Sequence, residues 1–102
     1  MSVQLVAPAP ANHTPRVLNP ELVERLATLT KAERELRAMG IEIEHSMLTI
    51  GRPEIGIRRR PGQSLAALLD RMGPRDYRQA IHQVEVRGAF MDCTVSWMES
   101  RA

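Results

Sequence analysis

Apolar residues recur at helical spacing between residues 19 and 39. Asn19, Pro20 and Glu21 are typical of a helix start. The Asn side chain caps free backbone N–H groups, proline fits the first helical position, and an acid complements the helix dipole. Gly40 predicts the end of the helix, because glycine readily takes the left-handed conformation there. One apolar stripe is expected to face a core, formed by Leu22, Leu26, Leu29, Leu36 and Met39.

A second start signal lies inside this helical segment. Thr30 and Glu33 have the spacing of a capping box, in which each side chain satisfies a backbone N–H of the other residue. The sequence therefore allows either one continuous helix or a helix that restarts at Thr30.

The hydrophobic period changes to two after Gly40, which predicts a strand. Ile41 and Ile43 alternate with glutamates, so one face of the strand is expected to be wet. The alternation slips near Ser46, where we expect a bulge or a bend. A turn at residues 51–54 then leads to a returning strand around residues 55–57, which completes a first hairpin.

A short helix and a second hairpin are expected in the rest of the chain. Ser64 precedes an apolar run that ends near Met72 and is followed by Gly-Pro, which predicts a helix of about two turns. Residues 77–87 and 91–97 each alternate, and Gly88 with Ala89 predicts the turn between them. On this pattern the core face of the last two strands carries Ala80, His82, Val84, Val86, Met91, Cys93, Val95 and Trp97.

This order of elements predicts an α+β fold. We expect an antiparallel sheet of about four strands, built from two hairpins, with the long N-terminal helix packed on one face and the short helix between the hairpins. Residues 19–102 would form this single domain. Residues 1–18 contain three prolines and no apolar period, so they predict a disordered N-terminal arm.

Length and composition limit the class of protein. A chain of 102 residues supports one core, which excludes a large multi-domain enzyme. No apolar run approaches the roughly 20 residues of a membrane-spanning helix, and the first residues lack the basic region of a secretory signal. The single cysteine, Cys93, cannot form an internal disulfide. We therefore expect a cytoplasmic protein without a membrane partner.

Arginines are concentrated in the middle of the chain. Residues 52–78 hold seven basic and three acidic groups, although the net charge of the whole chain is only +2. Guanidinium groups bind phosphate and carboxylate bidentately, so the cluster predicts a binding surface for an acidic partner or for nucleic acid. The alternatives are a solvated surface and a GC-rich coding bias. The arginines singled out for binding are Arg52, Arg58, Arg59, Arg60, Arg75 and Arg78.

Catalytic and metal-binding patterns are not recognisable. His45, His82 and Cys93 are the residue types that bind zinc, but they lie far apart without the spacing of ligand pairs. A Cys–His nucleophilic pair would also need an oxyanion site and an orienting group, and the sequence identifies neither. We expect no catalytic residue, no metal and no cofactor, and hence not an enzyme.

Aromatic residues suggest where a partner could bind. Only three are present, too few for the stacking platform of a single-strand nucleic-acid binder. With a turn at Gly88, Trp97 is expected in the core, whereas Phe90 and Met98 fall on the opposite face and would be exposed beside arginine. The edges of an open sheet could also pair with another chain. A protein partner and a homodimer are therefore expected.

Three short motifs carry a resemblance to a known group of proteins. They are the helix-to-strand join Leu36-Arg37-Ala38-Met39-Gly40-Ile41-Glu42-Ile43, the turn Gly51-Arg52-Pro53, and the strand Cys93-Thr94-Val95-Ser96-Trp97. On these residues the stretch 36–99 resembles small proteins of unknown function encoded by prophages and integrated mobile elements of GC-rich proteobacteria. The helical insert 64–72 departs from the compact hairpin pattern of that group.

The resemblance implies a small phage accessory protein, from a group that includes inhibitors of host defence systems, and it brings no catalytic residues. Together with the arginines, it leads us to expect a non-enzymatic protein that binds another protein, one form of which is inhibition of a host defence complex. The alternative is a nucleic-acid-binding protein that uses Arg52 and Arg58 to Arg60 against phosphates, with affinity that falls steeply with salt.

Overall fold

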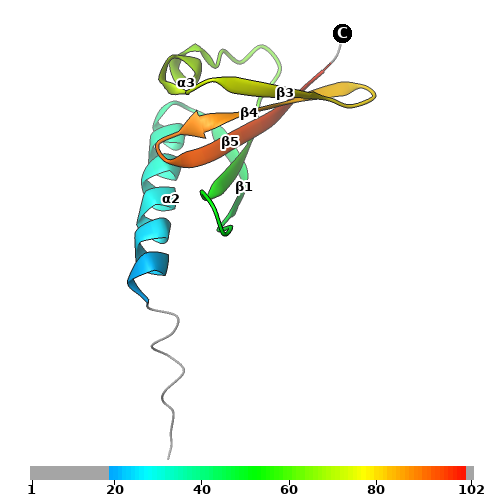
Figure 1. The fold of residues 1–102 in the computed structure, drawn as a ribbon. Helices are drawn as coiled ribbons and strands as arrows, with labels where there is room; N and C mark the ends of the chain where they lie inside the picture. The colour runs from blue at the N-terminus through cyan, green and yellow to red at the C-terminus, as the bar shows by residue number, and fades with distance from the viewer. Residues whose placement is uncertain (1–18, 101–102) are drawn as a thin grey trace, which may run out of the picture.

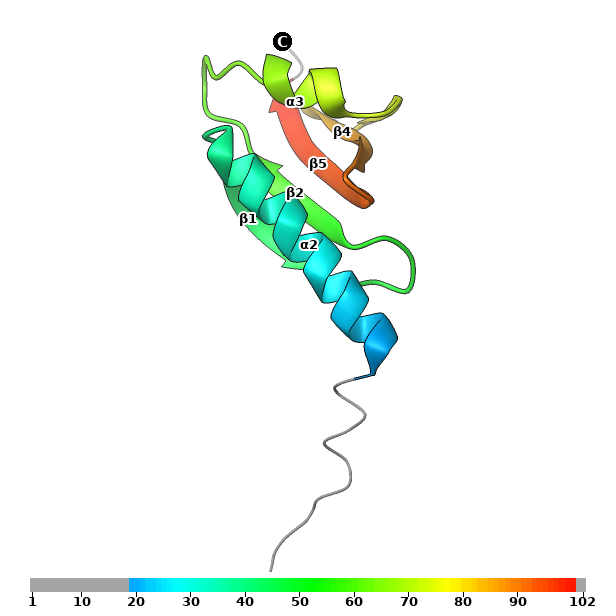
Figure 2. The ribbon, with the colours of Figure 1, turned by 90° about the vertical axis from the view of Figure 1, so that its left-hand side faces the viewer.

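The structure is a computed structural model that describes residues 19–100. Its elements follow the order α2 (Pro20–Ala38), β1 (Glu42–Met47), β2 (Glu54–Arg58), α3 (Ala66–Arg71), β3 (Arg75–Gln79), β4 (Gln83–Phe90) and β5 (Cys93–Ser100). The strands form one sheet in the order β1-β2-β5-β4-β3, and both helices lie on the same face of it (Figures 1 and 2). The arm expected at residues 1–18 lies outside the described residues.

The α+β class is confirmed, with five strands in place of about four and a mixed sheet in place of an antiparallel one. β1 and β2 form the expected antiparallel hairpin. β4 pairs antiparallel with both β3 and β5, but β2 pairs with β5 in parallel, with Ile55 opposite Val95. The first hairpin and the three-stranded meander β3-β4-β5 are thus joined side by side through β2 and β5.

The additional strand comes from a turn that the alternation did not predict. The run over residues 77–87 is broken at Ile81 and His82, where Ala80 donates its N–H to the Gln83 carbonyl at 2.8 Å. β3 therefore ends at Gln79 and β4 begins at Gln83. Neither turn residue is Gly, Pro, Asn or Asp, so the usual sequence signal of a tight turn is absent here.

The turn expected at Gly88 and Ala89 is wrong. β4 continues to Phe90, and the chain reverses at Met91 and Asp92, whose φ angles of 50° and 63° are those of a tight hairpin turn. Gly88 instead provides space within the strand: a Cβ there would lie 2.6 Å from Cε of Met72, the residue that follows α3. The glycine thus serves close packing of the helix connection on the sheet.

The long helix is continuous, so the restart at Thr30 does not occur. Asn19 accepts a hydrogen bond from the Leu22 N–H at 2.8 Å, which confirms the expected cap, and Gly40 has a φ of 76° after the last turn. Of the expected stripe, Leu29 and Leu36 are buried but Leu26 is 44% exposed. The first half of α2 therefore contributes little to the core.

The core lies entirely between the sheet and the two helices. It contains no buried polar or charged residue among those the structure describes. The expected short helix is confirmed, as Ala66–Arg71, and it packs through Leu68 and through Leu65 just before it. The core members are Leu29, Ala32, Leu36, Ile41, Ile55, Ile57, Leu65, Leu68, Met72, Val86, Phe90, Cys93, Val95 and Trp97.

The other face of the sheet carries no helix (Figure 1). A bulge between Ile43 and His45, slightly earlier than the expected position near Ser46, changes which β1 side chains reach this face. His45 lies over Gly56 of β2, whereas Ser46 turns to the helix side and bonds Glu33 of α2 through its hydroxyl. In the described part of the chain no helix is long and apolar enough to cross a membrane.

Candidate functional site

The central arginines are held in ion pairs within the chain. Arg58 lies 3.1 Å from Glu44 and 4.0 Å from Glu42, and Arg60 lies 3.8 Å from Glu42. Arg58 and Arg60 thus share an acid from β1, and their charge is largely balanced. Exposed pairs of this kind contribute about 0–1 kcal/mol each, so they balance charge more than they stabilise the fold.

Arg59 is directed elsewhere. Its guanidinium lies 2.8 Å from Glu99 of β5, whose same oxygen accepts a bond from the Trp97 indole N–H. The Arg59 Nε also donates to the Gln63 carbonyl at 3.1 Å. The three consecutive arginines therefore do not form one cationic surface, because the middle one pairs with a different strand.

The other three predicted arginines lie apart from this group. Arg52 is exposed in the β1–β2 connection, and its guanidinium has no partner within residues 19–100. Arg75 and Arg78 are on β3, which the strand order separates from β2 by β5 and β4. Arg75 donates to the carbonyl of Leu69, a residue of α3, at 3.4 Å. The structure thus distributes the predicted binding arginines over three places.

Phe90 is not an exposed binding residue. It is 1% exposed, and the Arg71 guanidinium lies 5.1 Å from the centre of its ring. The correction follows from the turn at Met91 and Asp92, since Phe90 pairs with Cys93 and therefore points to the same face as Trp97. Met98 is 44% exposed on the opposite face, and Trp97 is in the core, both as expected.

The three candidate zinc-ligand types lie in separate places. Cys93 is buried under α2, His45 is on the opposite face, and His82 is in the β3–β4 turn. Within the described residues no group of three or more His, Cys, Asp or Glu side chains is arranged to hold a metal ion.

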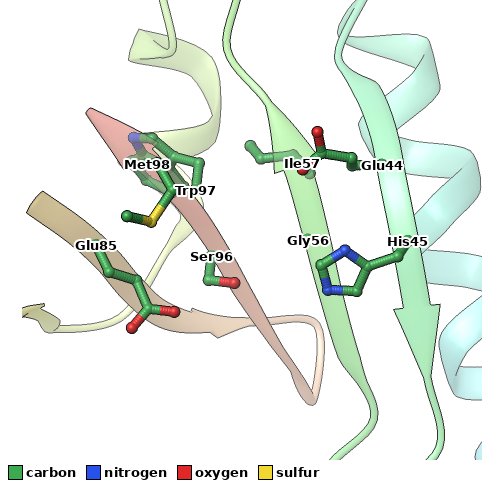
Figure 3. A pocket seen from close by; sticks show the side chains of 8 residues that line it. All are labelled: Glu44, His45, Gly56, Ile57, Glu85, Ser96, Trp97 and Met98. Atoms are coloured by element: carbon green, nitrogen blue, oxygen red, sulfur yellow. The ribbon is translucent and has the colours of Figure 1, made fainter. Parts of the chain in front are cut away.

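His45 borders a small hollow on the open face, which Figure 3 shows from close by. Glu44, Glu85, Ser96 and Met98 also line it, and its volume is about 110 Å³. Ligand pockets usually measure about 300–1,000 Å³, so this hollow is small for a substrate. Over residues 19–100 no hydrogen bond joins the imidazole to Ser96 or to a carboxylate. The serine, histidine and acid are near one another but are not arranged as a triad.

Burial raises the pKa of the Cys93 thiol, and the Asp92 and Glu33 carboxylates add to the shift. The thiol also lies 3.9 Å from the Thr28 carbonyl of α2. Because the thiolate is the reactive form, we expect native Cys93 to react with a disulfide reagent at pH 8 about 100-fold more slowly than the unfolded chain. The release of thionitrobenzoate with and without urea measures both rates. Equal rates would contradict the burial of this thiol.

The pH dependence of stability follows from the same shift. A thiol whose pKa is raised on folding stabilises the native state fully below its ordinary unfolded pKa, and this contribution is lost as the pH rises toward the folded pKa. Cys93 should therefore make the free energy of unfolding fall in alkaline solution.

An apolar end that the sequence pattern did not reveal is formed by Val23, Leu26 and Ile50. The first two are about half exposed on the first half of α2, and Ile50 is fully exposed in the β1–β2 connection. Arg25 donates from Nη2 to the Gly51 carbonyl at 3.0 Å, which ties this connection to the helix. Leu26 had been expected in the core, but it is 44% exposed. The first turns of α2 extend beyond the ends of the strands (Figure 2).

Fold and surface together define the class as a small sheet-and-helix domain with exposed apolar side chains at one end. No family model, no curated protein and no solved structure matches this chain.

Proposed function

We propose that this protein is not an enzyme and acts by binding another protein through its apolar end. The observation that supports this proposal is the solvent exposure of Ile50. A fully exposed isoleucine at the tip of a connection gains nothing for the fold, whereas it can bury its whole side chain in a partner, a gain of about 1.5–3 kcal/mol.

The connection around Ile50 is held in shape before any partner binds. Thr49 donates its hydroxyl to the Arg52 carbonyl at 2.7 Å across the turn, and Arg25 bonds Gly51 from the helix. A preorganised loop loses less conformational entropy on binding than a mobile one, so more of the contact energy appears as affinity.

The charges near Ile50 indicate the chemistry of the partner. Arg52 is exposed without an ion-pair partner in the described part of the chain, unlike Arg58, Arg59 and Arg60. The best fit is a protein surface with an apolar pocket for Ile50 and a carboxylate for Arg52. A narrower proposal is that the protein is an accessory protein of phage type that inhibits a host defence complex. It rests on the motif resemblance of residues 36–99 in addition to the surface described above.

A photo-crosslinking amino acid at position 50 tests the proposal directly. We expect it to link one host protein in a lysate of the native cell, whereas the same amino acid at position 81, another exposed isoleucine in a turn, should not link that protein. The captured protein should then bind the purified wild-type chain. Ile50→Asp should weaken this binding at least tenfold (about 1.4 kcal/mol) and Ile81→Asp should leave it unchanged.

Equal crosslinking from both positions, or equal binding of both aspartate variants, would overturn the proposal.

The nucleic-acid alternative is tested by fluorescence anisotropy with random single-stranded and duplex DNA and RNA. Saturable binding that weakens with salt, with a smaller salt slope when Arg58, Arg59 and Arg60 are changed to Ala, would replace protein binding with nucleic-acid binding. The internal ion pairs of these arginines lead us to expect no such binding.

A further inference from the structure

β3 forms one edge of the sheet, with β4 on one side and no strand of the described chain on the other (Figure 1). The hydrogen bond from the Ala80 N–H to the Gln83 carbonyl shows which residues of β3 direct their backbone N–H and C=O groups toward β4. Hydrogen-bonded pairs alternate along an antiparallel ladder, so Arg78 and Asp76 bond with β4. Arg75, Tyr77 and Gln79 therefore direct their N–H and C=O groups away from β4, toward the edge.

The order of side chains on β3 is self-complementary. Around a two-fold axis at Tyr77, an antiparallel second copy would place Asp76 opposite Arg78 of that copy, and Arg78 opposite its Asp76. Both are exposed on the face that carries no helix, so the two ion pairs would form side by side. The same register makes Tyr77 opposite Tyr77 a hydrogen-bonded pair, in agreement with the outward direction of its backbone groups.

The neighbouring strand extends this charge pattern. In β4, Arg87 lies opposite Asp76 and Glu85 lies opposite Arg78. In the dimer, each line of side chains across the four strands would then begin with Arg87 of β4 and Asp76 of β3 in one copy. It would continue with Arg78 of β3 and Glu85 of β4 in the second copy, so the charges alternate in sign. Tyr77, which is 63% exposed in the single chain, would contact its counterpart on the other face.

The opposite edge of the sheet does not offer the same fit. β1 carries Glu42 and Glu44 and is bulged between Ile43 and His45. Two copies paired there would bring acids together and would have to accommodate an irregular ladder, and both features discourage edge pairing.

We propose that two copies of this chain associate through antiparallel pairing of their β3 strands about Tyr77, which joins the two sheets into one. The interface is isologous, as expected for a two-fold dimer. Because β3 has only five residues, we expect a concentration-dependent equilibrium rather than a permanent dimer.

Two charge reversals test the register. Asp76→Arg places arginine opposite arginine in both pairs of a homodimer, and Arg78→Glu places glutamate opposite aspartate. We expect sedimentation velocity to show wild-type dimers at twice the chain mass of 11.5 kDa, and each variant alone as a monomer. An equimolar mixture of the two variants should regain the dimer, since each of its four charges then faces an opposite one.

The controls carry the same charge changes on α2. Glu24 and Arg34 are exposed and make no ion pair within residues 19–100, so Glu24→Arg and Arg34→Glu should dimerise like the wild type. Tyr77→Pro is a second disruptive variant, because proline is tolerated where a strand N–H faces outward yet cannot donate to a second copy. Circular dichroism verifies that every variant is folded.

A wild-type chain that stays monomeric at concentrations up to about 1 mM would overturn the proposal. It would also be overturned if the folded charge variants failed to associate on mixing, or if Tyr77→Pro dimerised as the wild type does. These outcomes do not depend on the crosslinking at position 50, so the two proposals can fail separately.

Discussion

Phe90→Ala should lower the free energy of unfolding by about 3–5 kcal/mol. The ring is 1% exposed in the core at the end of β4, and its removal leaves a cavity that the sheet and helix cannot fill. Arg71 would also lose the ring over which its guanidinium lies. Because domains of this size are stable by only about 5–15 kcal/mol, a large part of the stability would be lost. Urea denaturation followed by circular dichroism measures the change.

Met98→Ala is the matched control for Phe90. The sequence pattern had placed both residues on the same exposed face, but only Met98 is exposed, on the face of β5 that carries no helix. Its truncation should therefore cost less than about 0.5 kcal/mol. Similar losses for the two variants would contradict the turn at Met91 and Asp92, because that turn is what directs Phe90 into the core.

Leu36→Ala should cost about 2–5 kcal/mol, the second large effect that we expect. Leu36 has no exposed surface and lies in the last turns of α2, where the helix packs on the sheet. Its carbonyl also accepts the N–H of Ile41 at 3.0 Å, at the join between α2 and β1. Urea denaturation again gives the free energy of unfolding.

Leu26→Ala makes the same substitution in the same helix, so helix propensity is matched. Leu26 is 44% exposed, and we expect a loss below about 1 kcal/mol. A cost equal to that of Leu36→Ala would show that the first half of α2 is buried, which would remove one part of the apolar end. The pair of variants therefore tests both the core and the candidate interaction surface.

The candidate site could be predicted from the sequence only in part. The arginine cluster was visible, but its use was not, since Glu42, Glu44 and Glu99 reach it from other strands. The exposure of Ile50 was equally hidden. Isoleucines alternate along both strands of the first hairpin, and the pattern does not show that the β1–β2 ladder ends at Met47 and Glu54, which leaves Ile50 in the connection. Ion pairing and exposure are properties of neighbours that are distant in sequence.

The sequence by itself determined the features that depend on nearby residues. The Asn19 cap, the glycine at position 40 and the hairpin of β1 and β2 follow from local backbone preferences and short-range periodicity, and all are present. The α+β class follows from the same signals, since a helical period and a strand period can be told apart within a few residues.

Only the tertiary structure decided the arrangement of the sheet. The turn at Ile81 and His82 splits one expected strand into two, which adds one reversal of the chain before β5. As a result β5 runs parallel to β3 and also parallel to β2. With one reversal fewer, β5 would have run antiparallel to β2, as the sequence pattern predicted. No turn residue marks that reversal; the turn is closed by the Ala80–Gln83 bond within a ladder that β4 and β5 stabilise together. Long-range pairing thus overrode the local pattern and made β3 an edge strand, while the turn at Met91 and Asp92 directed Phe90 into the core.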